Sequence, residues 1–177
     1  MSGLFSYLAK PISILFGGTG GATKAAAQSS LDIQVATGSI DGISRGVGIV
    51  GEFSSASVAS SAVSLTSGVT ANLTSVSLPA GKYLVFGCVT FAPAATTSVT
   101  HLGVGSSQVS ASLGVIGDNS LEEFMAAVVP GAVVLSKQIP VRWVDISAAA
   151  TLYLVGDAIF SVSTMTAGGK INWVRVS

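Results

Sequence analysis

Charged side chains are scarce in this sequence. Only 9% of its 177 residues are charged, and the eight basic and eight acidic residues cancel, whereas about a quarter of the residues of a typical soluble domain are charged. Without a basic excess, the chain has no electrostatic attraction for nucleic acid or for an anionic membrane. We expect neither nucleic acid binding nor membrane insertion.

Hydrophobic residues, by contrast, make up 49% of the sequence. A monomer with so much apolar and so little ionised surface would be adhesive in water. We therefore expect other copies of the chain, or a larger assembly, to cover much of this surface. The alternative is a well-packed monomeric sandwich whose surface consists of serine and threonine.

Reactive side chains are also few. The single cysteine, Cys88, excludes an intrachain disulfide, and the apolar run Tyr83–Phe91 around it predicts a buried small hydrophobe. Cysteines and histidines are too few for a zinc site. The one histidine, His101, is expected to be a surface or interface imidazole, because no Gly-x-Ser-x-Gly elbow indicates a hydrolase.

The carboxylates form no catalytic pair in the sequence. Glu122 and Glu123 are adjacent, so their side chains should diverge, and the aspartates lie on separate predicted elements. We therefore expect no enzymatic activity, no cofactor and no metal. Asp118 and Asn119 are expected in a simple turn, with a calcium site as the alternative.

The first sixteen residues form an apolar arm. They lack the basic start of a secretory signal and are too short to span a bilayer. Such an arm needs a partner surface, and we expect it to dock into a larger particle. One alternative is packing against its own body or against two sister arms, and another is interfacial membrane binding, which the lack of a basic face disfavours. The residues expected to make the contact are Leu4, Phe5, Tyr7, Leu8, Ile12, Ile14, Leu15 and Phe16.

A glycine-rich joint follows the arm. Its glycines permit positive φ and close backbone approach, and one of its threonines can cap a short helix over the alanine-rich segment that follows. The joint begins with Gly17, Gly18, Thr19 and Gly20 and ends at Leu31.

The stretch from Pro11 to Leu31 reads P-I-S-x-x-x-G-G-T-G-x-x-T-x-A-A-A-x-x-x-L and resembles a segment of bacteriophage tail-fibre proteins. In that family, the segment usually precedes a trimeric fibre module. The resemblance implies a virion protein, made in the host cytoplasm and anchored by its N-terminus in a tail or capsid component. Because the segment occurs once, we expect a short spike or fibre tip rather than a long fibre.

The rest of the chain is predicted to be all-β. Residues 32–61 read as a glycine-rich connector, and residues 62–177 alternate short β-prone runs with turn residues, as is typical of a sandwich or barrel. The predicted strands are Ala62–Thr66, Leu73–Leu78, Gly81–Phe91, Ser98–Val104, Ser107–Leu113, Ala132–Lys137, Val141–Ser147, Thr151–Phe160 and Lys170–Val176. The predicted turns include Pro79–Gly81, Gly117–Asn119 and Ala167–Gly169.

One segment, Leu121–Val129, predicts a short helix. Asn119 or Ser120 could cap it, acidic residues occupy its first turn, and Pro130 would end it. A loop carrying the two glutamates is the alternative.

The body carries a second resemblance. The runs S-L-P-A-G-K-Y-L-V-F-G-C-V-T-F, A-T-L-Y-L-V-G-D-A-I-F and A-G-G-K-I-N-W-V-R-V-S are similar to those of jelly-roll modules in phage fibres, whose layout is like that of trimeric tumour necrosis factor-like heads. The resemblance implies an eight-stranded jelly roll in which three copies pack around one axis. Trp143 and Trp173 are then expected in the core or between copies, rather than stacked on sugars.

Together these features predict a phage structural protein, a short trimeric tail fibre or spike that attaches to the host surface, where a glycan is a candidate ligand. A capsid-attached head fibre or decoration protein is the alternative, and a glycan-degrading spike is a second one. The residues expected in receptor-facing loops are Ala94, Thr96, Asp118, Asn119, Thr166 and Gly168.

Overall fold

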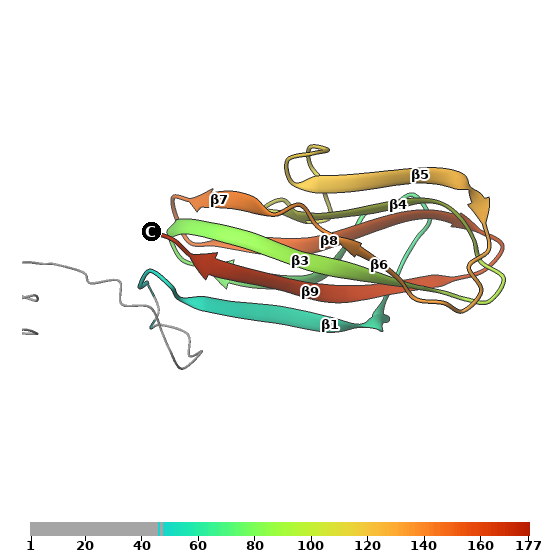
Figure 1. Cartoon of the computed structure of the whole chain (residues 1–177), viewed down its shortest axis with the longest axis horizontal. Coiled ribbons are helices and arrows are strands. Elements are labelled where there is room, and N and C mark those ends of the chain that lie inside the picture. The colour runs from blue at the N-terminus through green and yellow to red at the C-terminus, as the bar shows by residue number, and fades with distance from the viewer. Residues whose placement is uncertain (1–45, 47) are drawn as a thin grey trace, which may run out of the picture. The chain divides into compact units, whose positions relative to one another are not determined.

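Strands dominate the part of the chain that the structure describes. The structure is a computed structural model that describes residues 46 and 48–177 (Figure 1). The predicted arm and joint, residues 1–31, lie outside these residues. The strands are β1 (Phe53–Ser64), β2 (Ala71–Leu78), β3 (Gly81–Pro93), β4 (Ser98–Ser107), β5 (Ser120–Val128), β6 (Leu135–Gln138), β7 (Arg142–Ile146), β8 (Ala150–Ser161) and β9 (Met165–Arg175).

Two antiparallel sheets form a β-sandwich, as the sequence predicts. The first sheet has the order β1-β9-β3-β6, and β7 also pairs with β3. The second sheet has the order β2-β8-β4-β5. Strands that are consecutive in the sequence mostly lie in different sheets, so most neighbours within a sheet are distant in the sequence.

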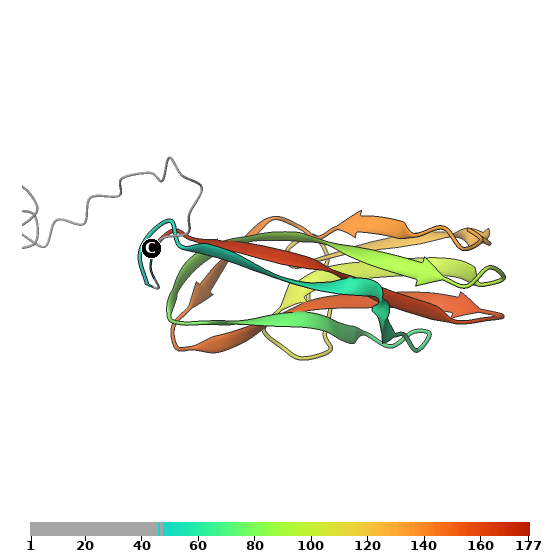
Figure 2. The ribbon, with the colours of Figure 1, turned by 90° about the horizontal axis from the view of Figure 1, so that it is seen from below.

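The sandwich has two ends, which we call the base and the tip. The base holds residues 48–52, the turn between β2 and β3, and Val176–Ser177. There the amide of Gly51 donates to the carbonyl of Arg175. The tip holds the four connections β1–β2, β3–β4, β5–β6 and β8–β9 (Figures 1 and 2).

Alternating residues of the central strands form the core. In β3, the side chains of Tyr83, Val85, Val89 and Phe91 are fully buried, and those of Leu152 and similar residues of β8 pack in the same cluster. Burying each large apolar side chain contributes about 1.5–3 kcal/mol. The prediction that one face of these strands lines a core is confirmed.

The predicted helix over Leu121–Val129 is wrong, because these residues belong to strand β5. Leu121 pairs with Val104 of β4, and Phe124 pairs with His101. The acidic first turn and Pro130 are local signals worth about 1 kcal/mol or less each. A full antiparallel ladder with β4 outweighs them, since tertiary context commonly overrides helix propensity.

Two predicted boundaries also differ from the structure. The predicted strand Ser107–Leu113 is a loop, because β4 ends at Ser107. Strand β1 begins at Phe53, within the stretch predicted as a connector, and its first six residues pair with β9. The serine-rich composition of β1 resembles a linker, but its backbone groups still complete the sheet.

The predicted turn Ala167–Gly169 lies inside strand β9. Gly168 pairs with Thr90 of β3, and on its other side β1 has a register irregularity between Val58 and Val63. A Cβ atom on Gly168 would lie 2.0 Å from the carbonyl oxygen of Ala59. The glycine therefore marks a close approach of two backbones and not a turn.

A buried ion pair fastens the base. The Nε of Arg175 donates to Oε2 of Glu52 at 3.0 Å, and both side chains are more than 90% buried. The same carboxylate oxygen accepts from the amide of Gly48 at 2.8 Å. Arg175 also donates to the carbonyl of Ala80 at 2.9 Å and to the hydroxyl of Tyr83.

Tyr83 completes this network from strand β3. Its hydroxyl donates to the carbonyl of Pro79 at 2.9 Å, and the guanidinium of Arg175 lies 4.7 Å from its ring centre. Burial raises the pKa of the Tyr83 hydroxyl above its ordinary value, although the charge of Arg175 opposes the shift. The network thus joins residues 48–52, the β2–β3 turn and the last strand.

Replacing Glu52 with alanine should lower the free energy of unfolding by about 3–5 kcal/mol, because the charge of Arg175 would stay buried without a partner. Urea denaturation of the full chain measures this. The control is Lys82→Ala, which breaks a pair with Asp145 whose side chains are 62% and 71% exposed. It should lose about 1 kcal/mol or less, and equal losses for both variants would contradict the assignment.

Replacing Gly168 with alanine should destabilise the sandwich by about 1–3 kcal/mol, as overpacking does. The added methyl would displace the backbone of β1 at Ala59. Thermal unfolding compares this variant with Thr96→Ala, which alters an exposed residue of the β3–β4 turn and should be neutral. A neutral Gly168→Ala would mean that β1 does not approach β9 here.

Candidate functional site

The outer face of the first sheet carries a line of apolar side chains. Trp143 of β7 pairs with Leu84 of β3, Leu84 pairs with Val174 of β9, and Val174 pairs with Phe53 of β1. The four residues therefore lie in one cross-strand line over four strands. With Phe86, two residues further along β3, we call them the apolar row.

The apolar row is open to solvent in one copy of the chain. The exposed fraction is 67% for Trp143, 41% for Phe53 and 38% for Phe86, while Leu84 and Val174 are half-buried. These residues point away from the core because they alternate with buried ones such as Tyr83 and Val85. A contiguous exposed apolar surface of this kind marks a contact site.

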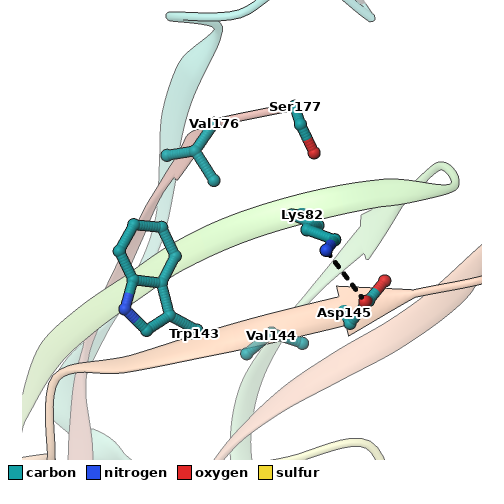
Figure 3. A pocket seen from close by; sticks show the side chains of 6 residues that line it. All are labelled: Lys82, Trp143, Val144, Asp145, Val176 and Ser177. Carbon is teal, nitrogen blue, oxygen red and sulfur yellow. Dashed lines mark ion pairs between the residues drawn. The ribbon is translucent and has the colours of Figure 1, made fainter.

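Polar side chains border the apolar row at the base. A hollow of about 480 Å³ beside Trp143 is lined by Lys82, Val144, Asp145 and the last two residues (Figure 3). The Nζ of Lys82 lies 3.7 Å from Oδ2 of Asp145, at the edge of this hollow. An apolar centre with a polar rim is the usual anatomy of a protein–protein contact.

A second hollow lies beside the apolar row, between strands β1 and β3 and over β9. Its volume is about 360 Å³, and Phe53, Phe86, Lys170 and Asn172 are among the residues of β1, β3 and β9 that line it. Both hollows are shallow surface features with few polar groups directed to one point. The arrangement suits the packing of another surface more than the capture of a small molecule.

His101 occupies a different face, on the second sheet, and it is buried at 5% exposure. The expectation of a surface imidazole is therefore wrong for the folded chain. The reason is strand β5, whose Phe124 stacks on the imidazole at 4.4 Å between ring centres. The Nε2 of His101 lies 3.5 Å from Oε2 of Glu122.

This histidine cluster offers no recognisable catalytic arrangement. Glu122 and Glu123 diverge as expected, since Glu123 pairs instead with Lys137 of β6. Among residues 46 and 48–177, no group of three or more His, Cys, Asp and Glu side chains could hold a metal ion. Nor does this part of the chain contain a helix that could cross a membrane.

The predicted receptor-facing residues do not form one site. Ala94 and Thr96 lie in the β3–β4 turn at the tip, whereas Asp118 and Asn119 lie in the connection between β4 and β5, away from the tip. Thr166 and Gly168 are inside strand β9, so their assignment to a loop is wrong. The amide oxygen of Asn119 accepts from the amide of Val115 at 2.6 Å, which makes a turn locally.

Other predicted residues divide between the two faces of the first sheet. Trp173 is 7% exposed and packs edge-on against Tyr83, so its placement in the core is confirmed. Cys88 is half-buried rather than buried, because it alternates with core residues of β3 and faces outward. The predicted docking and joint residues, from Leu4 to Leu31, lie outside the described residues.

Comparisons with known proteins leave the family open. No protein-family model matches the sequence, and no curated protein matches it. A chain in a solved structure titled "Structure of infectious bursal disease virus Gx strain" is similar over 79% of this chain, with 13% identity and a TM-score of 0.37. This chain spans about a third (36%) of the length of that viral chain.

The fluorescence of Trp143 should show whether the apolar row is covered, provided that Trp143 is the only tryptophan in the chain. The sequence has two tryptophans, so Trp173→Phe leaves Trp143 alone. At micromolar concentration, we expect its fluorescence to be blue-shifted and protected from acrylamide, and to become water-exposed on dilution. Emission typical of water at every concentration would show that the apolar row is free in solution.

Proposed function

We propose that this protein is a virion structural protein, a short trimeric tail fibre or spike of a bacteriophage. In this proposal, the N-terminal arm anchors it and the β-sandwich projects as a head that attaches to the host. The observation that carries the proposal is the apolar row, an exposed contact surface on a chain with very few charges. The tail-fibre-like sequence from Pro11 to Leu31 supports it.

The strand order supports a jelly roll. If β6 and β7 are two halves of one strand, interrupted at residues 139–141, the sandwich has eight strands in sheets of four. When these eight strands are counted along the chain, the first sheet contains the first, eighth, third and sixth strands in that order. The second sheet contains the second, seventh, fourth and fifth. This interleaving is the order of a double-sheet jelly roll, an architecture common in viral and lectin domains.

A trimer would cover the apolar row. Three-fold packing is heterologous, so the row of one copy would contact a different surface of the next copy. Large aromatic side chains such as Trp143 and Phe86 dominate the energetics of such contacts. Because the lysines and aspartate around the row lie at its rim, closing the contact need not bury them.

The base and the tip then have different roles. In this proposal, the tip, which lies at the end of the sandwich opposite residues 48–52, is the part that faces the host. Of the predicted receptor-facing residues, Ala94 and Thr96 remain candidates for contact with the host surface or its glycans. Three linked heads would gain avidity without additional contacts in each head.

The trimer is tested by sedimentation of the full chain. We expect a trimer at micromolar concentration and a monomer for Trp143→Lys, because a charge placed in the apolar row would be desolvated by the contact without a partner. The matched control is Ile159→Lys, which alters a 42% exposed residue on the second sheet and should remain trimeric. A monomeric parent protein would contradict the proposal.

The position on the particle separates the alternatives. A tail fibre should be required for adsorption to host cells, whereas a head fibre or decoration protein should remain with emptied capsids and be dispensable for adsorption. Removing residues 1–16 should abolish incorporation into particles in both cases. A glycan-degrading spike would instead release reducing ends from host polysaccharide.

A further inference from the structure

The tip of the sandwich contains no ionisable side chain. Its four connections are residues 65–70, 94–97, 129–134 and 162–164, which the sequence shows to be free of Asp, Glu, Lys, Arg and His. The β3–β4, β5–β6 and β8–β9 connections come from separate parts of the chain and lie together at the end opposite the base (Figures 1 and 2). The β1–β2 connection stops short of that end, and its Thr70 donates to Asp157 of β8 at 3.1 Å. The charged residues of the described part all lie on the strands, at the base or in the β4–β5 connection.

Exposed valines take the place of charges at the tip. Three of the four connections contribute them, and the β5–β6 connection reads Val-Pro-Gly-Ala-Val-Val. Val162 is held at a φ of 76°, a conformation that is rare for a β-branched residue. The exposed fractions are 53% for Val69, 60% for Val129, 61% for Val133, 50% for Val134 and 80% for Val162.

Hydrogen bonds satisfy part of the polar backbone of three of the four connections. The carbonyl of Thr164 accepts from the amide of Ala94 at 3.0 Å and from the hydroxyl of Thr97 at 2.7 Å. The hydroxyl of Ser67 donates to the carbonyl of Phe160 and accepts from its amide. These bonds fix three connections to one another or to β8, and they reduce the penalty for moving the tip out of water.

We infer that the tip contacts a lipid bilayer by placing its valines at the boundary between headgroups and acyl chains. A convex set of turns without charged side chains lacks the pattern that fixes the register of a protein partner. A fluid bilayer needs no such pattern. The absence of charge also favours zwitterionic lipid, because no electrostatic attraction to anionic headgroups is available.

This inference departs from the sequence-based expectation of no membrane insertion. That expectation concerned charge and the arm at residues 1–16, whereas the valines of the β5–β6 and β8–β9 connections come from separate parts of the chain and reach the same end of the sandwich only in the fold. The inference rests on the proposed function only for the direction in which the tip points. Burying one valine side chain changes a partition constant by about tenfold.

The test is co-sedimentation of the full chain with phosphatidylcholine vesicles. We expect binding that is unchanged when the salt concentration rises from about 0.1 to about 0.5 M and when phosphatidylglycerol is added, since neither changes an apolar contact. The rise in salt shortens the Debye length from roughly 10 to roughly 4 Å, so it would weaken an electrostatic contact. The variant Val129→Ser/Val133→Ser/Val162→Ser should bind at least about a hundredfold more weakly. The matched control is Val141→Ser, an equally exposed valine at 66% that lies outside the tip.

Three outcomes would overturn the inference. Binding that needs anionic lipid would show an electrostatic contact, and binding that survives the triple substitution would place the contact elsewhere, for instance in the arm. A triple variant that loses its oligomeric state without vesicles would make the tip a contact between copies. Because sedimentation without vesicles tests the trimer separately, failure of the proposed function and failure of this inference are distinguishable.

Discussion

The buried pair between Arg175 and Glu52 is the constraint on which the base of the sandwich depends. Neither charge could remain buried alone, so the residues that precede β1 must lie beside the end of β9. The same guanidinium reaches the β2–β3 turn through Ala80 and Tyr83. The side chain of Arg175 therefore holds together the segment before β1, the β2–β3 turn, the start of β3 and the end of β9.

The register that this constraint helps to set also creates the apolar row. Phe53 lies in line with Val174 because β1 starts directly after Glu52, and Leu84 and Trp143 continue that line across β3 and β7. A shift of one residue in β1 would turn Phe53 to the opposite face. The apolar row is thus a property of strand pairing and not of any single segment.

The sequence predicts the parts of this fold that local pattern determines. The β-prone runs Gly81–Phe91 and Thr151–Phe160, with turn residues between such runs, indicated the central strands and the sandwich, since several short strands at this spacing are typical of that fold. The helix at Leu121–Val129 and the turn at Ala167–Gly169 failed because both segments pair with another strand, β4 and β1 respectively, and local pattern does not show that pairing. The apolar row could not be predicted either, because its members come from four strands whose order in the sheet is not written in any of them.

The pairing of β1 with β9 has a consequence for how the protein is made. During synthesis, β1 emerges long before its partner β9. Strand β3 also lacks this neighbour until β9 is made, because β9 lies between β1 and β3 in the sheet. The first sheet can therefore close only after β9 has left the ribosome, and contacts so distant in sequence form slowly. The serine- and alanine-rich composition of β1 keeps that early strand compatible with water during the delay, so the nascent chain exposes little adhesive surface from it.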